Sequence, residues 1–135
     1  MDSLGTKLAW IFSGTFLLAT VVGFIPNPLV GSEGIFLTNT PHNLVHLVTA
    51  VAFLIVAKMG NVPSIRFMQI FGPVYLLVGL IGFAVTGTSS TGMLLGFIHI
   101  NALDNFLHLG LGAAIFSAGT IANNALKLSN RPTTA

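Results

Sequence analysis

The stretch Asn39–Leu47 reads NTPHNLVHL and the stretch Asn101–Leu109 reads NALDNFLHL, and these two motifs decide how the chain is expected to fold. Their polar residues recur at one constant offset, because Asn39, Asn43 and His46 match Asn101, Asn105 and His108 position by position. Each motif stands at the head of a long apolar segment. Polar and ionisable side chains are costly in such a segment, so their repeated placement there needs a structural or functional reason.

The composition places the chain among integral membrane proteins. Of its 135 residues, 53% are hydrophobic and only 6% are charged, whereas soluble domains carry about a quarter charged residues. The net charge of +2 is too small to indicate a nucleic-acid partner. The absence of cysteine excludes disulfides and thiolate metal sites. We expect one domain over residues 1–135 that has the lipid bilayer as its immediate partner.

Four apolar segments are long enough to cross the hydrocarbon core of a bilayer. Pro26 and Pro28 end the first, which we expect to be retained as a helix because no small-x-small cleavage site precedes Pro26. Asn39 and Asn101 are good N-cap residues for the second and fourth. The sequence predicts helices over about 8–25, 39–59, 65–86 and 101–127, joined by irregular loops.

The two halves of the chain resemble each other beyond the motifs. Gly23 and Phe24 match Gly82 and Phe83 at an offset slightly smaller than that of the motifs, so the second connecting loop is slightly longer than the first. We therefore expect two tandem helical-hairpin repeats, about 8–59 and about 67–126. An even number of helices separates equivalent points, so the repeats should be related by a two-fold axis along the membrane normal. The predicted fold class is an all-α, integral membrane four-helix bundle.

The charge distribution predicts the topology. The five cationic residues lie near the N-terminus, in the central turn or near the C-terminus: Lys7, Lys58, Arg66, Lys127 and Arg131. The positive-inside rule then places both termini in the cytoplasm and both motifs near the opposite face. The expected location is a bacterial inner membrane or a photosynthetic membrane.

Helical spacing predicts two further features. In each motif the polar residues share one arc of the helix surface, and His46 and His108 lie about 10 Å along their helices from the caps. In parallel repeats these two histidines should lie at the same depth. Gly110, Ala114 and Ala118 recur at intervals of four, which predicts a face for close helix packing.

The motifs N-x-x-H-N-x-x-H-L and N-x-x-D-N-x-x-H-L, each leading an apolar helix, resemble those of a bacterial family of small four-helix membrane proteins called domain of unknown function 4383. The resemblance extends from about Leu8 to Leu126. It implies the four-helix fold and its topology, and it implies no activity.

The first interpretation of the motifs is structural. Asn residues cap the helices, His42 and Asp104 occupy the capping-box position, and the remaining polar side chains hydrogen-bond across the bundle. The protein would then be an accessory subunit of a larger membrane complex, with neither a catalytic site nor a metal site, and it would not be an enzyme. The structural motif residues are Asn39, His42, Asn43, His46, Asn101, Asp104, Asn105 and His108.

The second interpretation is a cofactor site. Two histidines at one depth on neighbouring helices are the arrangement that bis-imidazole haem ligation requires, and one histidine can bind the magnesium of a chlorophyll. His46 and His108 would be the axial ligands, and Gly110 or Gly112 would leave room for the macrocycle.

The third interpretation is a small transporter or proton-relay protein. Asp104 and His108 share a helix face at a spacing of four and could pass protons. No nucleophile, phosphate-binding loop or complete catalytic set accompanies them.

Overall fold

A computed structural model describes residues 3–131. The first and last residues of the predicted domain, 1–2 and 132–135, lie outside the described residues. The elements follow the order α1 (Leu4–Phe24), β1 (Val30–Gly31), β2 (Phe36–Leu37), α2 (Thr40–Met59), α3 (Asn61–Thr86), β3 (Thr91–Leu94), β4 (Ile98–Asn101) and α4 (Ala102–Ser129).

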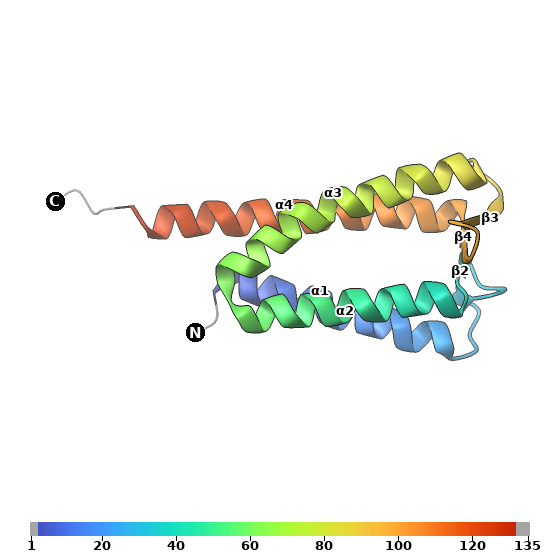
Figure 1. Cartoon of the computed structure of the whole chain (residues 1–135), viewed down its shortest axis with the longest axis horizontal. Coiled ribbons are helices and arrows are strands. Elements are labelled where there is room, and N and C mark those ends of the chain that lie inside the picture. Colours follow the sequence, from blue (N-terminus) through green and yellow to red (C-terminus); the bar gives the residue numbers. More distant parts are fainter. Residues whose placement is uncertain (1–2, 132–135) are drawn as a thin grey trace.

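The helices form two hairpins, α1 with α2 and α3 with α4, which lie side by side (Figure 1). The α2–α3 turn, the N-terminal end of α1 and the C-terminal end of α4 lie at one end of the molecule, and the short strands lie at the other (Figure 1). We refer to these as the turn end and the strand end. The two motifs therefore lie together at the strand end, where α2 and α4 begin.

Side-chain caps fix where α2 and α4 begin. The Oδ1 atom of Asn39 accepts from the His42 backbone N–H at 3.2 Å, and Pro41 occupies the first turn. Asn101 and Asp104 form a reciprocal capping box, with distances of 2.9 and 2.7 Å. Both predicted N-caps are confirmed. Each satisfies an N–H group that a helix start otherwise leaves without a partner.

Helix α3 begins at Asn61, earlier than the predicted position near 65. Pro63 is the third residue of the helix, where its missing N–H costs no intrahelical bond. Gly60 makes the turn from α2 with φ of 106°, a conformation that side chains disfavour. The Ser64 hydroxyl donates to the Gly60 and Val56 carbonyls and secures the start of the helix.

The prediction of irregular loops is wrong at the strand end. β1 and β2 form a short parallel pair, and β3 and β4 form an antiparallel hairpin in which Leu94 pairs with Ile98. Leu95 and Gly96 turn the hairpin with φ of 54° and 83°. Ile98 and Ile100 alternate inward and pack with Leu94 in a small core. The fold is thus dominated by its four helices but is not purely α-helical.

Glycines bring α3 and α4 into close contact. A Cβ atom on Gly72 would lie 2.6 Å from the backbone nitrogen of Phe116, and one on Gly112 would lie 2.7 Å from that of Leu76. Gly119 faces Met68 in the same way. The predicted packing face is therefore wrong at Gly110, which is exposed and would have nothing within 4 Å of a Cβ atom.

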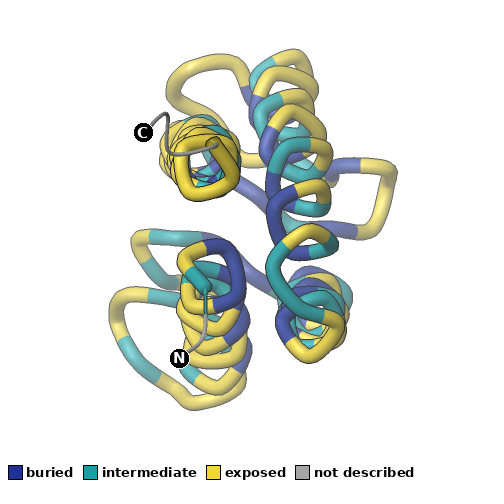
Figure 2. The backbone as a smooth tube through the Cα atoms, turned by 90° about the vertical axis from the view of Figure 1, so that its left-hand side faces the viewer, coloured by how far each residue is buried: buried dark blue, intermediate teal, exposed yellow. Residues whose placement is uncertain are grey.

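Aromatic rings fill the space between the two hairpins. Phe53 of α2 meets the edges of Phe67 and Phe71 of α3 at centroid distances of 4.9 and 5.5 Å. Phe16 of α1 meets Tyr75 of α3 at 5.5 Å. Figure 2 shows the buried segments turned toward this layer and the exposed ones turned outward. Edge-to-face pairs of this kind add to the free energy gained by burial alone.

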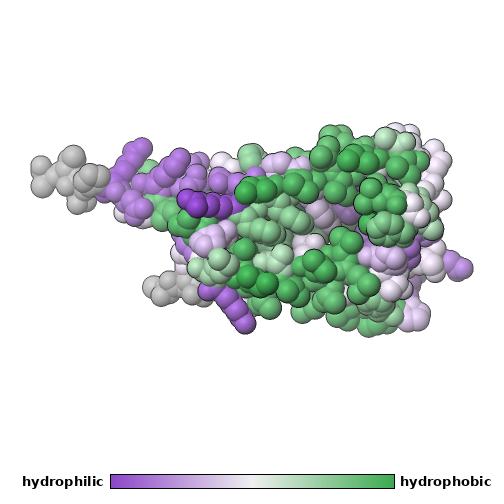
Figure 3. Space-filling model, in the orientation of Figure 1, coloured by the Kyte–Doolittle hydropathy of each residue, from purple (hydrophilic) through white to green (hydrophobic). Residues whose placement is uncertain are grey.

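All four helices are long and apolar enough to cross a membrane. The shortest, α2, has 20 residues, which span about 30 Å, the thickness of the hydrocarbon core. Exposed Leu, Ile, Val and Phe side chains cover the outside of the bundle, and hydrophilic residues gather toward the turn end (Figure 3).

We expect Gly72→Ala to lower the stability of the bundle by about 1–3 kcal/mol, because the new methyl group forces α3 away from Phe116. Gly110→Ala is the matched control on α4 and should raise stability by up to about 1 kcal/mol through helix propensity. Unfolding in a mild detergent, followed by circular dichroism, measures both. Equal stability changes in the two variants would contradict the described packing.

Candidate functional site

Both motifs contribute to one site at the strand end, between the two hairpins. Asn39, His42, Asn43 and His46 lie on the first two turns of α2 or at its cap, and their counterparts lie on α4. His42, Asn43, Asp104, Asn105 and His108 are buried. The structure thus brings all eight residues of the predicted polar motif to the same end of the bundle, but their contacts divide them into groups.

Asn39 and Asn101 each donate a hydrogen bond to the loop of the other hairpin. Asn39 Nδ2 donates to the carbonyl of Phe97 at 2.8 Å, and Asn101 Nδ2 donates to that of Ile35 at 2.7 Å. The acceptor residues Ile35 and Phe97 have the same separation in the sequence as the donors Asn39 and Asn101. Each asparagine therefore caps its own helix with its oxygen and holds the loop of the other hairpin with its nitrogen.

A second pair of contacts follows the same offset. His42 Nδ1 lies 2.9 Å from the carbonyl oxygen of His99, and Asp104 Oδ2 accepts from the backbone N–H of Leu37 at 3.1 Å. In the repeat, His42 corresponds to Asp104 and Leu37 corresponds to His99. At these matching positions the first motif thus offers an imidazole N–H to a carbonyl, and the second offers a carboxylate to an N–H.

Asn43 and Asn105 fasten each motif helix to its own hairpin partner. Asn43 Nδ2 donates to the Gly23 carbonyl, and Asn105 Nδ2 donates to the Thr86 hydroxyl, both at 2.8 Å. A Cβ atom at Gly23 would collide with the Asn43 carboxamide, and one at Gly82 with that of Asn105. A side chain at either position, which correspond to each other in the sequence, would therefore displace the carboxamide and break its hydrogen bond.

Three imidazoles meet on the axis between the hairpins. The ring of His42 lies 4.6 Å from that of His46 and 5.8 Å from that of His108, measured between centroids. One nitrogen from each ring can be chosen so that all three lie within 4.8 Å of one another. We call His42, His46 and His108 the histidine triad.

The triad differs from the structural prediction in its hydrogen bonding. The Nδ1 atoms of His46 and His108 are buried and have no hydrogen-bond partner among residues 3–131. The predicted hydrogen bonds of these two histidines are therefore not formed at Nδ1. The Oδ1 atoms of Asn43 and Asn105 also lack a partner in the described chain, although the Nδ2 atom of each donates within its own hairpin. The side-chain bonds that cross between the hairpins come from Asn39, Asn101, His42 and Asp104. Buried polar groups without partners are costly and call for an explanation.

Sequence reasoning misses His42 as a candidate ligand, because it assigns this residue only to the capping-box position. The available signal is its spacing of four from His46, which puts both imidazoles on one face of α2. Combined with the predicted equal depth of His46 and His108, that spacing would have completed the triad.

Two apolar cavities flank the triad, with volumes of about 210 and 290 Å³. The three histidines and Tyr75 line both of them. The smaller cavity also reaches Phe16 and Asp104. The Tyr75 ring stands edge-on to His108 at a centroid distance of 4.9 Å. The triad thus lies in an apolar setting that has Asp104 as its nearby acidic group.

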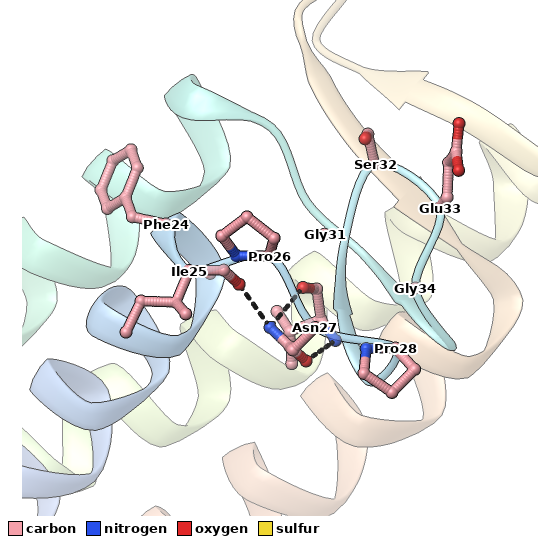
Figure 4. Close-up of a pocket in the computed structure, with 11 residues that line it drawn as sticks. Phe24, Ile25, Pro26, Asn27, Pro28, Gly31, Ser32, Glu33 and Gly34 are labelled. Atoms are coloured by element: carbon pink, nitrogen blue, oxygen red, sulfur yellow. Dashed lines mark hydrogen bonds between the residues drawn. The ribbon is translucent and has the colours of Figure 1, made fainter.

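A separate hollow of about 430 Å³ lies beneath the loop that follows α1 (Figure 4). Asn27 organises this loop: its Nδ2 donates to the carbonyls of Val22, Ile25 and Val30, and its Oδ1 accepts from two backbone N–H groups. Glu33 is the one ionisable side chain on the lining. This hollow is explained by the loop's own turn geometry and offers no set of converging chemical groups.

The positions of these side chains can be compared with what a haem site and a proton relay would each need. A haem held by His46 and His108 needs a planar macrocycle between the two rings, and the His42 ring lies close to both. Gly112 is packed against Leu76, and Gly110 is exposed on the outside of α4. Neither glycine therefore opens a slot for the macrocycle beside the triad. For a proton relay, Asp104 Oδ2 already accepts two backbone N–H groups. The site therefore suits a small ligand at the triad better than a macrocycle.

Comparison with known proteins gives one match. No curated protein sequence and no solved structure matches the chain. The family model described as "Domain of unknown function (DUF4383)" matches residues 7–121, which include both motifs and most of all four helices. The resemblance seen in the sequence is confirmed, and the chain belongs to the DUF4383 family.

Proposed function

We propose that the protein is a multi-pass membrane protein that acts as a non-catalytic accessory subunit of a larger complex in a bacterial inner or photosynthetic membrane. Its motifs join two tandem hairpin repeats at the face opposite the cytoplasm. The observation that carries the proposal is that Asn39 and Asn101 each donate a hydrogen bond to the loop of the other hairpin. These two hydrogen bonds give Asn39 and Asn101 a structural role, since each joins one hairpin to the loop of the other.

The outer surface supports membrane insertion. Large apolar side chains point outward along every helix, including Leu18 of α1, Val48 of α2, Ile70 of α3 and Ile121 of α4, each at least 60% exposed. In water such a surface would be a severe aggregation hazard, whereas in lipid it is the expected exterior. The inward face, by contrast, carries the aromatic layer and the motif side chains.

Three sets of contacts support an internal duplication over about 8–59 and about 67–126. The Asn39 and Asn101 exchange, the His42 and Asp104 contacts and the glycines beneath Asn43 and Asn105 all recur at the offsets of the sequence repeat. In both halves, the motif helix packs on the helix that precedes it. Contacts that run reciprocally between halves are those expected of a two-fold axis along the bundle.

Charge supports a cytoplasmic position for both termini. Lys7, Lys58, Arg66, Lys127 and Arg131 are all on elements or turns at the turn end, and none lies at the strand end of the described chain. Helix α4 has 28 residues, about 42 Å, and extends past the other helices there (Figure 1). Its projecting last turns provide a surface on which another subunit can pack.

The topology can be tested with single cysteines, because the chain has none of its own. Ser90→Cys lies in the exposed loop at the strand end, and Ser129→Cys lies in the exposed last turn of α4. A membrane-impermeant maleimide should label the first in intact cells and the second only after the membrane is opened. The reverse pattern would overturn the proposed orientation.

The tie between the hairpins can be tested at Asn101. Asn101→Ser retains an oxygen that can cap α4 but lacks the nitrogen that donates to Ile35. We expect a loss of about 0.5–1.5 kcal/mol in the free energy of unfolding, measured in mild detergent. Asn124→Ala, at an exposed position of the same helix, is the control and should not destabilise. An Asn101→Ser variant as stable as the wild type would show that the hydrogen bond to Ile35 does not stabilise the contact between the hairpins.

The accessory role can be tested by native electrophoresis of mild-detergent extracts. The tagged chain from its own host should migrate in an assembly larger than the same chain expressed alone in a foreign host. Replacing exposed Asn124 by a photo-cross-linking residue should join α4 to a second polypeptide of defined mass. Identical migration from both hosts, with no cross-linked product, would refute the accessory role.

A further inference from the structure

We propose that the histidine triad is a binding site for one divalent transition-metal ion of the class that favours imidazole nitrogen, such as Zn²⁺ or Cu²⁺. His42, His46 and His108 would supply three ligands, and the flanking cavities would leave a fourth position open. The proposal goes beyond the accessory role and does not depend on it. It departs from the expectation of no metal site drawn from the sequence.

The spacing of the ligand atoms fits one ion. Nitrogens from the three rings lie within 4.8 Å of one another. Zinc at about 2.1 Å from each nitrogen of a tetrahedral site sets the nitrogens about 3.4 Å apart. The longest separation exceeds this by no more than roughly 1.4 Å, which small side-chain rotations can close.

The hydrogen bonding of His42 prepares it as a ligand. Its Nδ1 lies 2.9 Å from the His99 carbonyl, a contact that requires the proton on Nδ1 and leaves the Nε2 lone pair free. Metal-binding histidines are oriented in this way by a hydrogen bond from the other ring nitrogen. The carbonyl of β4 thus fixes the tautomer of a residue on α2.

His46 and His108 provide the second independent observation. Their Nδ1 atoms are buried without a hydrogen-bond partner among the described residues. The neighbouring Asn43 and Asn105 also leave their Oδ1 atoms without a partner, but each of them donates one hydrogen bond through Nδ2. A metal ion satisfies an unshared nitrogen pair where no donor is available. A bound ion would therefore give a partner to the buried nitrogens of both histidines.

The surroundings fit a bound dication of this class. Asp104 lines the same cavity as the triad and brings the one carboxylate that can offset the ion's charge. The described chain offers no thiolate and no second carboxylate there, and three imidazoles suit zinc and copper better than magnesium or calcium. Tyr75 and Phe16 add apolar rings to the lining of the same cavity.

The test uses the full chain, purified in mild detergent without a histidine tag and stripped of metal. Titration with Co²⁺ should give one ion per chain with the visible bands of low-coordinate cobalt. Electron paramagnetic resonance of the Cu²⁺ form should show hyperfine coupling to nitrogen ligands. These readouts use the wild-type protein, so they decide the proposal even if a variant fails to fold.

The variants His42→Gln, His46→Gln and His108→Gln should each weaken Co²⁺ binding at least about 10-fold, because each removes a ligand. All three retain His99, so any binding that it or the detergent provides would persist in the triple variant. Zn²⁺ should raise the unfolding temperature of the wild type and not that of the triple variant.

Three results would overturn the proposal. They are a wild-type chain that takes up less than stoichiometric Co²⁺ and Cu²⁺, a triple variant that binds as tightly as the wild type, and a protein purified with a Soret or chlorophyll band that the histidine substitutions remove. The last result would assign the triad to a macrocycle. None of these results alters the expected behaviour of Asn101→Ser, so the two proposals can fail separately.

Discussion

The strand end of the bundle depends on one constraint: the backbone groups that leave regular structure there must still find hydrogen-bond partners. Asn39 and Asn101 meet it for both hairpins at once, since each caps its own helix and binds a carbonyl of the opposite loop. A carboxamide is suited to this because it donates and accepts from adjacent atoms. With the loops held in place, the His99 carbonyl orients His42, and the two motif helices bring the triad together.

The fold was predictable where local chemistry decides it. Asn39 and Asn101 mark helix starts in any context, because their side chains reach N–H groups three residues on. The β3–β4 hairpin was missed since its strands are short and its turn contains Leu95 in a conformation that sequence does not announce. The packing face of α4 was also misassigned. Small residues recur at both Gly110 and Gly112, and which of them faces α3 depends on the rotation of the whole helix.

The site was predictable only where spacing along the sequence decides which residues come together. Repeat spacing alone put His46 and His108 at matching depth and placed all eight polar residues at one end. It does not single out His42, because the corresponding residue of the second motif is Asp104; only the spacing of four from His46 indicates that His42 shares the same helix face. Nor could repeat spacing show which polar atoms find partners, since the carbonyl and hydroxyl groups that Asn43 and Asn105 bind come from distant segments. The Oδ1 atoms of these asparagines and the Nδ1 atoms of two imidazoles find no partner among the described residues.

The exchange of His42 for Asp104 at corresponding positions has an evolutionary consequence. In an ancestral pair of identical hairpins, this position would have carried the same residue in both copies, so a histidine or a carboxylate there would have appeared twice. Under the proposed duplication, covalent fusion of the two copies released them from that rule. One copy could then keep an imidazole and the other acquire a carboxylate that accepts from Leu37. Three imidazoles and one carboxylate around a single axis are a combination that gene fusion permits and that a symmetric dimer cannot encode.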